Sequence, residues 1–189
     1  MIGGKIQNYR NILRRYIRDY GENEDINRAV QVLERAKRDV LKAQDKTELI
    51  GYEGMASNAY FEVLPILILN QKTDFPFHGR NRRPPKDAVN AMLSFAYTLI
   101  ANDVAAALET VGLDPYVGFL HTLRPGRTSL ALDMMEELRA YLGDRFILSL
   151  INKRQISVKD FLFQGDNGVV MTDKGKKTFI TAWQARKGK

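Results

Sequence analysis

The sequence contains no cysteine, and this absence excludes several kinds of protein. Disulfide scaffolds, zinc ribbons and thiol nucleophiles all need cysteine side chains. Any metal site in this chain must therefore use oxygen and imidazole ligands, and histidine is also scarce, with two residues in the chain. Oxygen and imidazole ligands favour Mg²⁺ or Mn²⁺.

Long apolar runs are scarce as well. The longest, VLPILIL at 63–69, is interrupted by a proline and is far shorter than the roughly 20 residues that span a bilayer. The start, MIGGKIQNYR, lacks the apolar core and the cleavage pattern of a secretory signal. The sequence therefore predicts a cytoplasmic protein with no transmembrane helix and no membrane partner.

The chain has enough apolar residues for one domain with its own core. It has 189 residues, of which 44% are hydrophobic. Its net charge of +7 points to a polyanionic partner. The basic residues gather at 1–20 and 72–87, although an ordinary solvated surface is the alternative for each patch.

Apolar residues at steps of three and four predict helices over most of the chain. The expected helices cover 1–20, 25–43, a segment from Lys46 that kinks or stops near Pro65, 87–111 and 130–152. The helix over 87–111 is apolar almost all round, which predicts a place at the centre of a bundle. In the helix over 130–152, Ser129 is the expected N-cap, and the expected buried stripe is Leu130, Met134, Leu138 and Leu142.

Two short β-segments are expected near the C-terminus. FLF and VVM flank QGDNG, which predicts a hairpin, and Asp173 is the expected cap of a final helix. The predicted fold class is all-α: a helical bundle with a small β-hairpin near the C-terminus.

One histidine and several carboxylates form a candidate site. His121 lies in a loop ahead of the 130–152 helix, where Asp133 shares a face with Glu136 and Glu137. Imidazole and carboxylates together suit Mn²⁺ or Mg²⁺. A solvated acidic helix face and a structural histidine are the alternatives.

A further carboxylate stands between two glycines. Glu53 lies between Gly51 and Gly54 in a helical stretch, where each glycine costs roughly 1 kcal/mol of helix stability. Close approach of a backbone or a phosphate would explain the glycines, and a packing point against a neighbouring helix is the alternative.

Several segments resemble a known family. GYEGMASNAYF, RRPPKDAVNAMLSFAYTLI, GLDPYVGFLHTLRPGRTSLALDMMEELR and LINKRQI are similar, in order and spacing, to signature segments of the CRISPR-associated protein one family, the integrase and metal-dependent DNA nuclease of spacer acquisition. GLDP, PYVGFLH and the ending FITAWQARK most resemble the type I-C branch.

The resemblance implies a two-domain protein with an amino-terminal β-rich domain, which makes much of a homodimer, and an all-helical catalytic domain. Residues 1–189 correspond to the helical catalytic domain, so the chain is expected to be a fragment without the β-rich domain. The family's metal ligands fall on Glu53, His121 and Glu136, which are therefore the expected catalytic residues, with Asp133 as an accessory ligand.

The resemblance also implies an activity and partners. A DNA 3′-hydroxyl, or water in the nuclease mode, attacks a phosphodiester with the help of Mg²⁺ or Mn²⁺. The implied partners are DNA (prespacer and CRISPR repeat) and CRISPR-associated protein two. The expected DNA-binding residues are Arg80, Arg82, Arg83, Lys86, Arg124, Arg127, Lys153 and Arg154.

Two other functions remain open at this point. The chain could be a helical DNA-binding module with an incomplete metal site, inactive without the missing domain. It could also be a metal-dependent enzyme that acts on a smaller phosphate substrate.

Overall fold

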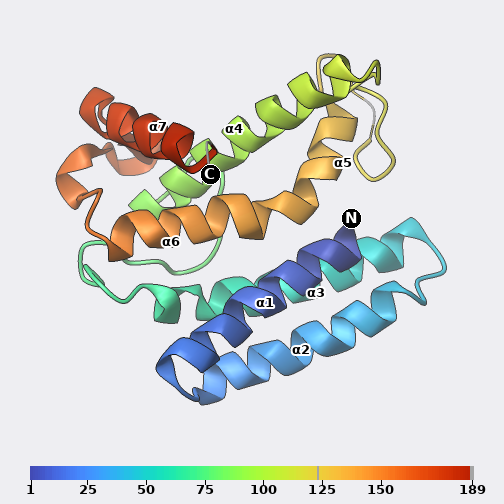
Figure 1. Ribbon diagram of the computed structural model, residues 1–189, viewed down its shortest axis with the longest axis horizontal. Coiled ribbons are helices and arrows are strands. Elements are labelled where there is room, and N and C mark those ends of the chain that lie inside the picture. Colours follow the sequence, from blue (N-terminus) through green and yellow to red (C-terminus); the bar gives the residue numbers. More distant parts are fainter. Residues whose placement is uncertain (123, 188–189) are drawn as a thin grey trace. The chain divides into compact units, whose positions relative to one another are not determined.

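The computed structural model in Figure 1 describes residues 1–122 and 124–187. Helices dominate this part of the chain, and its single sheet has two strands, as the predicted fold class requires. The chain divides into two compact units. The first unit comprises Met1–Val63 and Ala96–Gly143, and the second comprises Leu64–Phe95 and the chain from Asp144 onward.

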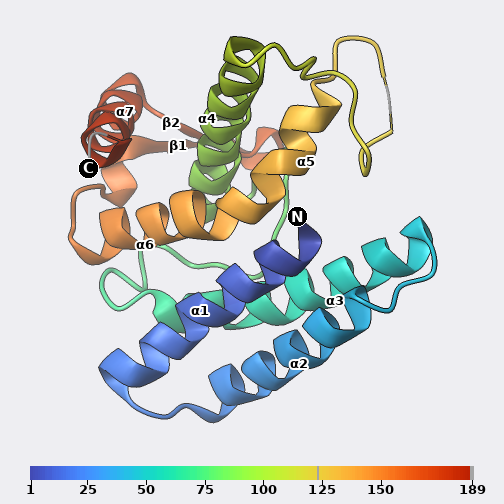
Figure 2. The ribbon, with the colours of Figure 1, turned by 45° about the vertical axis from the view of Figure 1, so that its right-hand side comes forward.

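Three helices form the amino-terminal part of the first unit: α1 (Ile2–Tyr20), α2 (Glu24–Val40) and α3 (Lys46–Val63). Helix α2 packs against both α1 and α3, and Figure 2 shows the three side by side. Gly21 ends α1 with a φ of 92°, a conformation that favours glycine. Asn23 caps α2, because its side chain accepts a 3.1 Å hydrogen bond from the Ile26 amide.

Helix α4 (Ala88–Thr110) is buried mainly in its first half, and Leu108 is a buried residue near its end. Residues 88–93 are buried, as are Ala96, Tyr97 and Ile100, whereas Asn102 and Asp103 are exposed. The predicted place of this helix at the centre of a bundle stays a prediction, because its two halves belong to different units. Within the described ranges, α4 is the one helix long and apolar enough to cross a membrane, a property that buried core helices share, and 44% of its apolar window is buried inside the protein.

The single helix expected over 130–152 is three segments. These are α5 (Ser129–Leu138), a π-helical segment η2 (Arg139–Asp144) and α6 (Arg145–Asn152). The N-cap position belongs to Thr128, and Ser129 is the first helical residue, which corrects the expected cap. A π-helical turn widens the backbone, and such turns often occur at functional sites.

The buried face of α5 also differs from the expected stripe. Met134 is 45% exposed, whereas Ala131 and Met135 are buried. The same face buries Asp133 and Glu136, so the carboxylates point into the protein instead of bordering its core. The sequence pattern predicted leucines on the buried face of α5, but Asp133 and Glu136 lie on that face.

The second unit contains the hairpin. Strands β1 (Phe161–Phe163) and β2 (Val169–Met171) pair antiparallel, with Phe161 opposite Met171, and this confirms the predicted hairpin. The short helices of this unit are η1 (Leu64–Leu67), η3 (Val158–Asp160) and η4 (Gly165–Asn167). Because η1 follows α3 directly, the early stop predicted near Pro65 is confirmed.

Helix α7 (Asp173–Lys187) completes the core of the second unit. The Phe146 ring of α6 lies 5.0 Å from the Phe179 ring and 5.2 Å from the Trp183 ring, measured between centroids. Thr172 caps α7 by accepting a 3.0 Å hydrogen bond from the Gly175 amide. Asp173 is the first helical residue, so the expected cap lies one residue too late.

Candidate functional site

A buried lysine joins two of the predicted metal ligands in the first unit. The Lys5 ammonium of α1 contacts Glu53 Oε1 of α3 and lies 2.7 Å from Glu136 Oε2 of α5. Lys5 is only 3% exposed. Two carboxylates that are 83 positions apart in the sequence therefore meet at one positive charge.

Burial of Lys5 follows from its place on α1. It precedes Ile6 and lies four residues before Tyr9, both of which face the core. The Tyr9 ring stacks on the Tyr60 ring at 3.9 Å, and the Lys5 ammonium lies 5.7 Å from the Tyr9 centroid. The sequence assigned Lys5 to a surface patch, although its position beside the apolar stripe was a signal of burial.

A buried ammonium is tolerated only when it is paired. Burial alone would lower the pKa of Lys5, but its interactions with Tyr9, Glu136 and Glu53 outweigh burial and raise that pKa above its usual value. Lys5 is therefore a permanent positive charge at physiological pH.

Glu53 lies at the more open side of this cluster. Burial alone would raise the pKa of the Glu53 carboxyl, but the Lys5 ammonium and a 2.8 Å hydrogen bond from the Ser57 hydroxyl hold it below its usual value. A Cβ added at Gly51 or Gly54 would meet no described atom within 4 Å. The helix-packing explanation for these glycines therefore finds no support in residues 1–122 and 124–187, and the space beside them is open.

Glu136 receives a second cation at its other oxygen. Arg139 Nη2 donates to Glu136 Oε1 at 2.8 Å, and the Arg139 guanidinium lies 4.8 Å from the centroid of the Tyr97 ring. Arg139 is the first residue of the π-helical segment, which the apolar pattern did not indicate. Its role in the cluster was missed because a glutamate and an arginine three residues apart usually form a solvated pair.

Asp133 holds His121 and the loop before it. Oδ2 accepts hydrogen bonds from the amides of Phe119 (2.5 Å) and Leu120 (2.8 Å), and Oδ1 accepts from the amide (3.0 Å) and Nδ1 (2.6 Å) of His121. Burial alone would raise the pKa of Asp133, but these bonds outweigh it and lower that pKa. Gly118 is required here, because a Cβ would lie 2.6 Å from the Ser129 carbonyl carbon and 2.8 Å from Asp133 Oδ2.

This geometry favours a supporting role for Asp133, and the accessory ligand role that the sequence suggested stays a prediction. Both of its oxygens are engaged, and the residue is fully buried. With Nδ1 donating to a carboxylate, a neutral imidazole presents the lone pair of Nε2, which forms no hydrogen bond within the described ranges. Metal-binding histidines are commonly oriented by a carboxylate in this way.

The predicted ligands fit a hard divalent cation in chemistry. Within residues 1–122 and 124–187, no three His, Asp or Glu side chains gather closely enough to hold one ion, because Glu53 and Glu136 close on Lys5 while His121 pairs with Asp133. The carboxylate pair nevertheless already accommodates a cation between its oxygens. Carboxylate oxygens with one imidazole nitrogen suit Mg²⁺ or Mn²⁺.

The basic residues expected to bind DNA fall in both units. Arg124 and Arg127 lie in the loop that follows His121, and Arg124 is exposed. In the second unit, Arg80 is partly buried and donates to Asn90 Oδ1 at 2.8 Å and to the Ser94 hydroxyl at 3.1 Å. The remaining candidates of that unit are exposed: Arg82, Arg83, Lys86, Lys153 and Arg154.

Asn90 fastens the loop before α4, a role that the sequence did not reveal. Fully buried, it donates to the Gly79 carbonyl (2.9 Å) and accepts from the Asn81 amide (3.0 Å). Arg80 thus helps to hold this loop in place, while Arg82 and Arg83 remain available to solvent.

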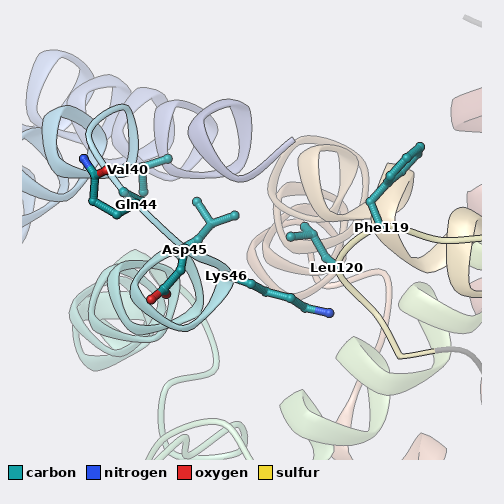
Figure 3. Close-up of a pocket in the computed structure, with 8 residues that line it drawn as sticks. Val40, Gln44, Asp45, Lys46, Phe119 and Leu120 are labelled. Atoms are coloured by element: carbon teal, nitrogen blue, oxygen red, sulfur yellow. The ribbon is translucent and has the colours of Figure 1, made fainter.

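An open cavity of about 360 Å³ lies beside the loop that carries His121. It is lined by the end of α2, the α2–α3 connection, Phe119 and Leu120, and Figure 3 shows the Lys46 side chain extending below Leu120. Gln44 and Asp45 add polar atoms to its wall. The cavity therefore borders the two residues that precede His121 in its loop.

Sequence comparison identifies related proteins. A family model described as CRISPR associated protein Cas1 matches residues 1–185. The CRISPR-associated endonuclease Cas1 1 of Chlorobaculum tepidum is 50% identical over 187 residues, which cover 97% of this chain and 54% of the relative. The chain thus spans about half the length of this curated relative.

Solved structures share the fold. A Cas1 protein from Thermotoga maritima is similar with a TM-score of 0.82 at 29% identity, over 97% of this chain and 55% of that one. A casposase bound to integration product has a TM-score of 0.79 at 26% identity, over 97% and 50% of the two chains. A chain of a partial Cas6-RT-Cas1–Cas2 complex, 24% identical, has a TM-score of 0.84 over 98% of this chain and 56% of that chain, which shows the fold alone.

Proposed function

Because this chain belongs to the CRISPR-associated Cas1 family, we propose that it is the helical catalytic part of a metal-dependent DNA endonuclease and integrase that inserts new spacers into a CRISPR array. The observation that supports this most is the meeting of Glu53 and Glu136 at one cation, in the unit that also holds His121 on Asp133. We also propose that the chain belongs to the type I-C branch of the family, because GLDP, PYVGFLH and FITAWQARK resemble that branch.

The proposed reaction is phosphoryl transfer to a DNA 3′-hydroxyl or to water. A divalent cation bound here would activate the attacking oxygen and neutralise charge on the phosphate and the leaving oxygen. Glu53 and Glu136 would supply negative oxygens, and His121 would supply Nε2. Asp133 fixes the ring by accepting from Nδ1, and thereby leaves Nε2 on the side of the ring away from the carboxylate.

The proposed substrate and partners follow from charge and from the relatives. Exposed Arg124, Arg82 and Arg83 would contact phosphates, which positions DNA without reading its bases. One structural neighbour, a casposase, is bound to an integration product, which supports DNA as the substrate. Membership of the family supports CRISPR-associated protein two as a partner. A homodimer of the whole protein and a cytoplasmic location complete the proposal.

The test is cleavage of branched DNA by this chain with and without Mn²⁺. We expect cleavage that requires Mn²⁺ and that Glu53→Gln abolishes, because the amide keeps the shape of the side chain but removes a negative ligand. Glu62→Gln is the matched control, since Glu62 is exposed on the same helix. Mn²⁺-dependent cleavage that survives Glu53→Gln would contradict the proposed ligand set.

A second function is favoured by one observation: Lys5 already pairs with Glu53 and Glu136, and Asp133 already pairs with His121. The chain would then be a helical DNA-binding module whose metal site is incomplete. In that case the chain would bind duplex or branched DNA but would neither bind Mn²⁺ nor cleave. Mn²⁺ binding to this chain would exclude the second function.

A further inference from the structure

Lys5 places its charge at the point that the two proposed carboxylate ligands share. Its ammonium contacts Glu53 Oε1 and lies 2.7 Å from Glu136 Oε2. Arg139 occupies the other oxygen of Glu136 at 2.8 Å. The four side chains carry two negative and two positive charges, so the cluster is neutral without a metal ion.

A divalent cation cannot simply be added to a neutral cluster of this kind. Both carboxylates already bond the Lys5 ammonium, through Glu53 Oε1 and Glu136 Oε2. Like charges at contact distance in a buried site repel strongly, because little water is present to screen them. Lys5 is nearly fully buried, so the two cations would compete for one position.

We propose that Lys5 is the resident cation of this site and that its ammonium must leave Glu53 and Glu136 before a divalent metal ion binds them. This inference rests on the proposed metal-dependent function. Lys5 is therefore a positioning residue, because it keeps the two carboxylates paired and close together when no metal ion is bound. It also lowers the affinity of the site for metal, since binding must break both ammonium contacts.

Arg139 cannot serve in place of Lys5. Its guanidinium bonds the opposite oxygen of Glu136 and is held over the Tyr97 ring, 4.8 Å from the centroid. Lys5 sits on a flexible side chain at the shared point of both carboxylates, and a compact ammonium on such a stem is able to withdraw without moving α1. The exchange of cations is thus assigned to Lys5.

A purely structural lysine and a competing lysine predict effects of opposite sign. If Lys5 only holds the carboxylates together, its loss lets them separate and weakens metal binding. If Lys5 competes with metal, its loss leaves two unpaired carboxylates that bind metal more tightly. Metal affinity therefore distinguishes the two roles, whereas activity alone does not.

The experiment measures Mn²⁺ binding by calorimetry to the wild-type chain and to Lys5→Met, which keeps the length of the side chain and removes its charge. We expect Lys5→Met to bind Mn²⁺ at least about tenfold more tightly. We also expect its melting temperature to fall without metal and to recover with Mn²⁺. Arg15→Met is the control, because it removes one charge from the exposed face of α1 and should leave the affinity unchanged.

The outcomes separate this inference from the function on which it rests. Equal or weaker binding by Lys5→Met, with Mn²⁺ binding by the wild type intact, overturns the inference and leaves the metal-dependent function standing. Absence of binding by both chains overturns both. Binding by Lys5→Met alone supports the inference in its strongest form.

A second measurement needs no variant and so holds even if Lys5→Met does not fold. In the wild-type chain, the ¹⁵N signal of the Lys5 ammonium is followed during titration with Mg²⁺. We expect that signal to change and to saturate together with metal binding, while the signal of exposed Lys42 stays constant. A Lys5 signal that is unchanged at saturating Mg²⁺ would show that the ammonium stays in place.

Discussion

His121 and Asp133 are hydrogen-bonded to each other, but we expect His121 to matter for cleavage and Asp133 for stability. Among the described residues, the partly exposed His121 ring makes one hydrogen bond, to Asp133, whereas the buried Asp133 accepts four. We expect His121→Ala to abolish Mn²⁺-dependent cleavage while lowering the free energy of unfolding by about 1 kcal/mol. Urea unfolding and the cleavage assay, run on the same preparation, measure both quantities.

Asp133→Ala should instead destabilise the fold. Three backbone amides lose their acceptor, so we expect the free energy of unfolding to fall by about 3 kcal/mol or more. If His121→Ala proved the more destabilising of the two, the histidine would be a structural residue and the proposed ligand set would lose its nitrogen.

Asp133 also predicts how stability depends on pH. Its pKa is lower in the folded chain than the ordinary value of 3.8. A group of this kind stabilises the fold fully above its ordinary pKa, and that contribution disappears as the pH falls toward the lower folded pKa. Melting temperatures measured on a series from neutral to acidic pH should therefore fall less steeply in Asp133→Asn than in the wild-type chain.

At the scale of elements, Gly54 makes α3 less stable than it could be. A Cβ at this position meets no described atom within 4 Å, and alanine is the better helix former by about 1 kcal/mol. We therefore expect Gly54→Ala to raise the free energy of unfolding by about that amount, as measured by urea titration. If DNA approaches α3 beside Glu53, the same variant should bind branched DNA more weakly.

Gly118→Ala is the contrasting change. Its Cβ would collide with the Ser129 backbone and with the Asp133 carboxylate, so the loop that carries His121 must shift. We expect lower stability and loss of cleavage together. A Gly118→Ala chain with normal cleavage would show that the placement of this loop does not govern the reaction.

The helices were largely predictable because apolar residues spaced three and four apart in the sequence form the buried face of a helix. The α5 face was not, because the decisive partners of Asp133 and Glu136 come from elsewhere: a loop, α1 and the π-helical turn. The leucine spacing and the carboxylates competed for the same side of α5, and no local pattern says which one wins. Lys5 was misassigned for the same reason, since a buried charge is recognisable only with its distant partners.

At the scale of the whole molecule, we expect the net charge of +7 to favour DNA binding through a few exposed cations. Each phosphate contact that is lost reduces the steepness of the logarithmic salt dependence by about 0.9 on duplex DNA. We expect the double change Arg82→Gln and Arg83→Gln to flatten this slope without altering sequence preference, as measured by fluorescence anisotropy at several salt concentrations.

The matched control is Arg35→Gln with Arg38→Gln, which removes the same charge from exposed positions of α2. If both double variants flatten the slope equally, binding responds to total charge and the loop before α4 has no special part. An unchanged slope for Arg82 and Arg83 would remove these residues from the proposed DNA surface.

The Asp133 clamp has a practical consequence for engineering this protein. The Asp133 carboxylate of α5 accepts hydrogen bonds from the amides of Phe119, Leu120 and His121. The position of the histidine is therefore fixed relative to α5. A second tether, from the Leu130 amide to the Pro115 carbonyl (2.9 Å), closes the same stretch from its other end. The turn at Pro125 and Gly126 is exposed and is therefore a permissive insertion point. A fluorophore or a fused module can be attached there without displacing the His121 imidazole.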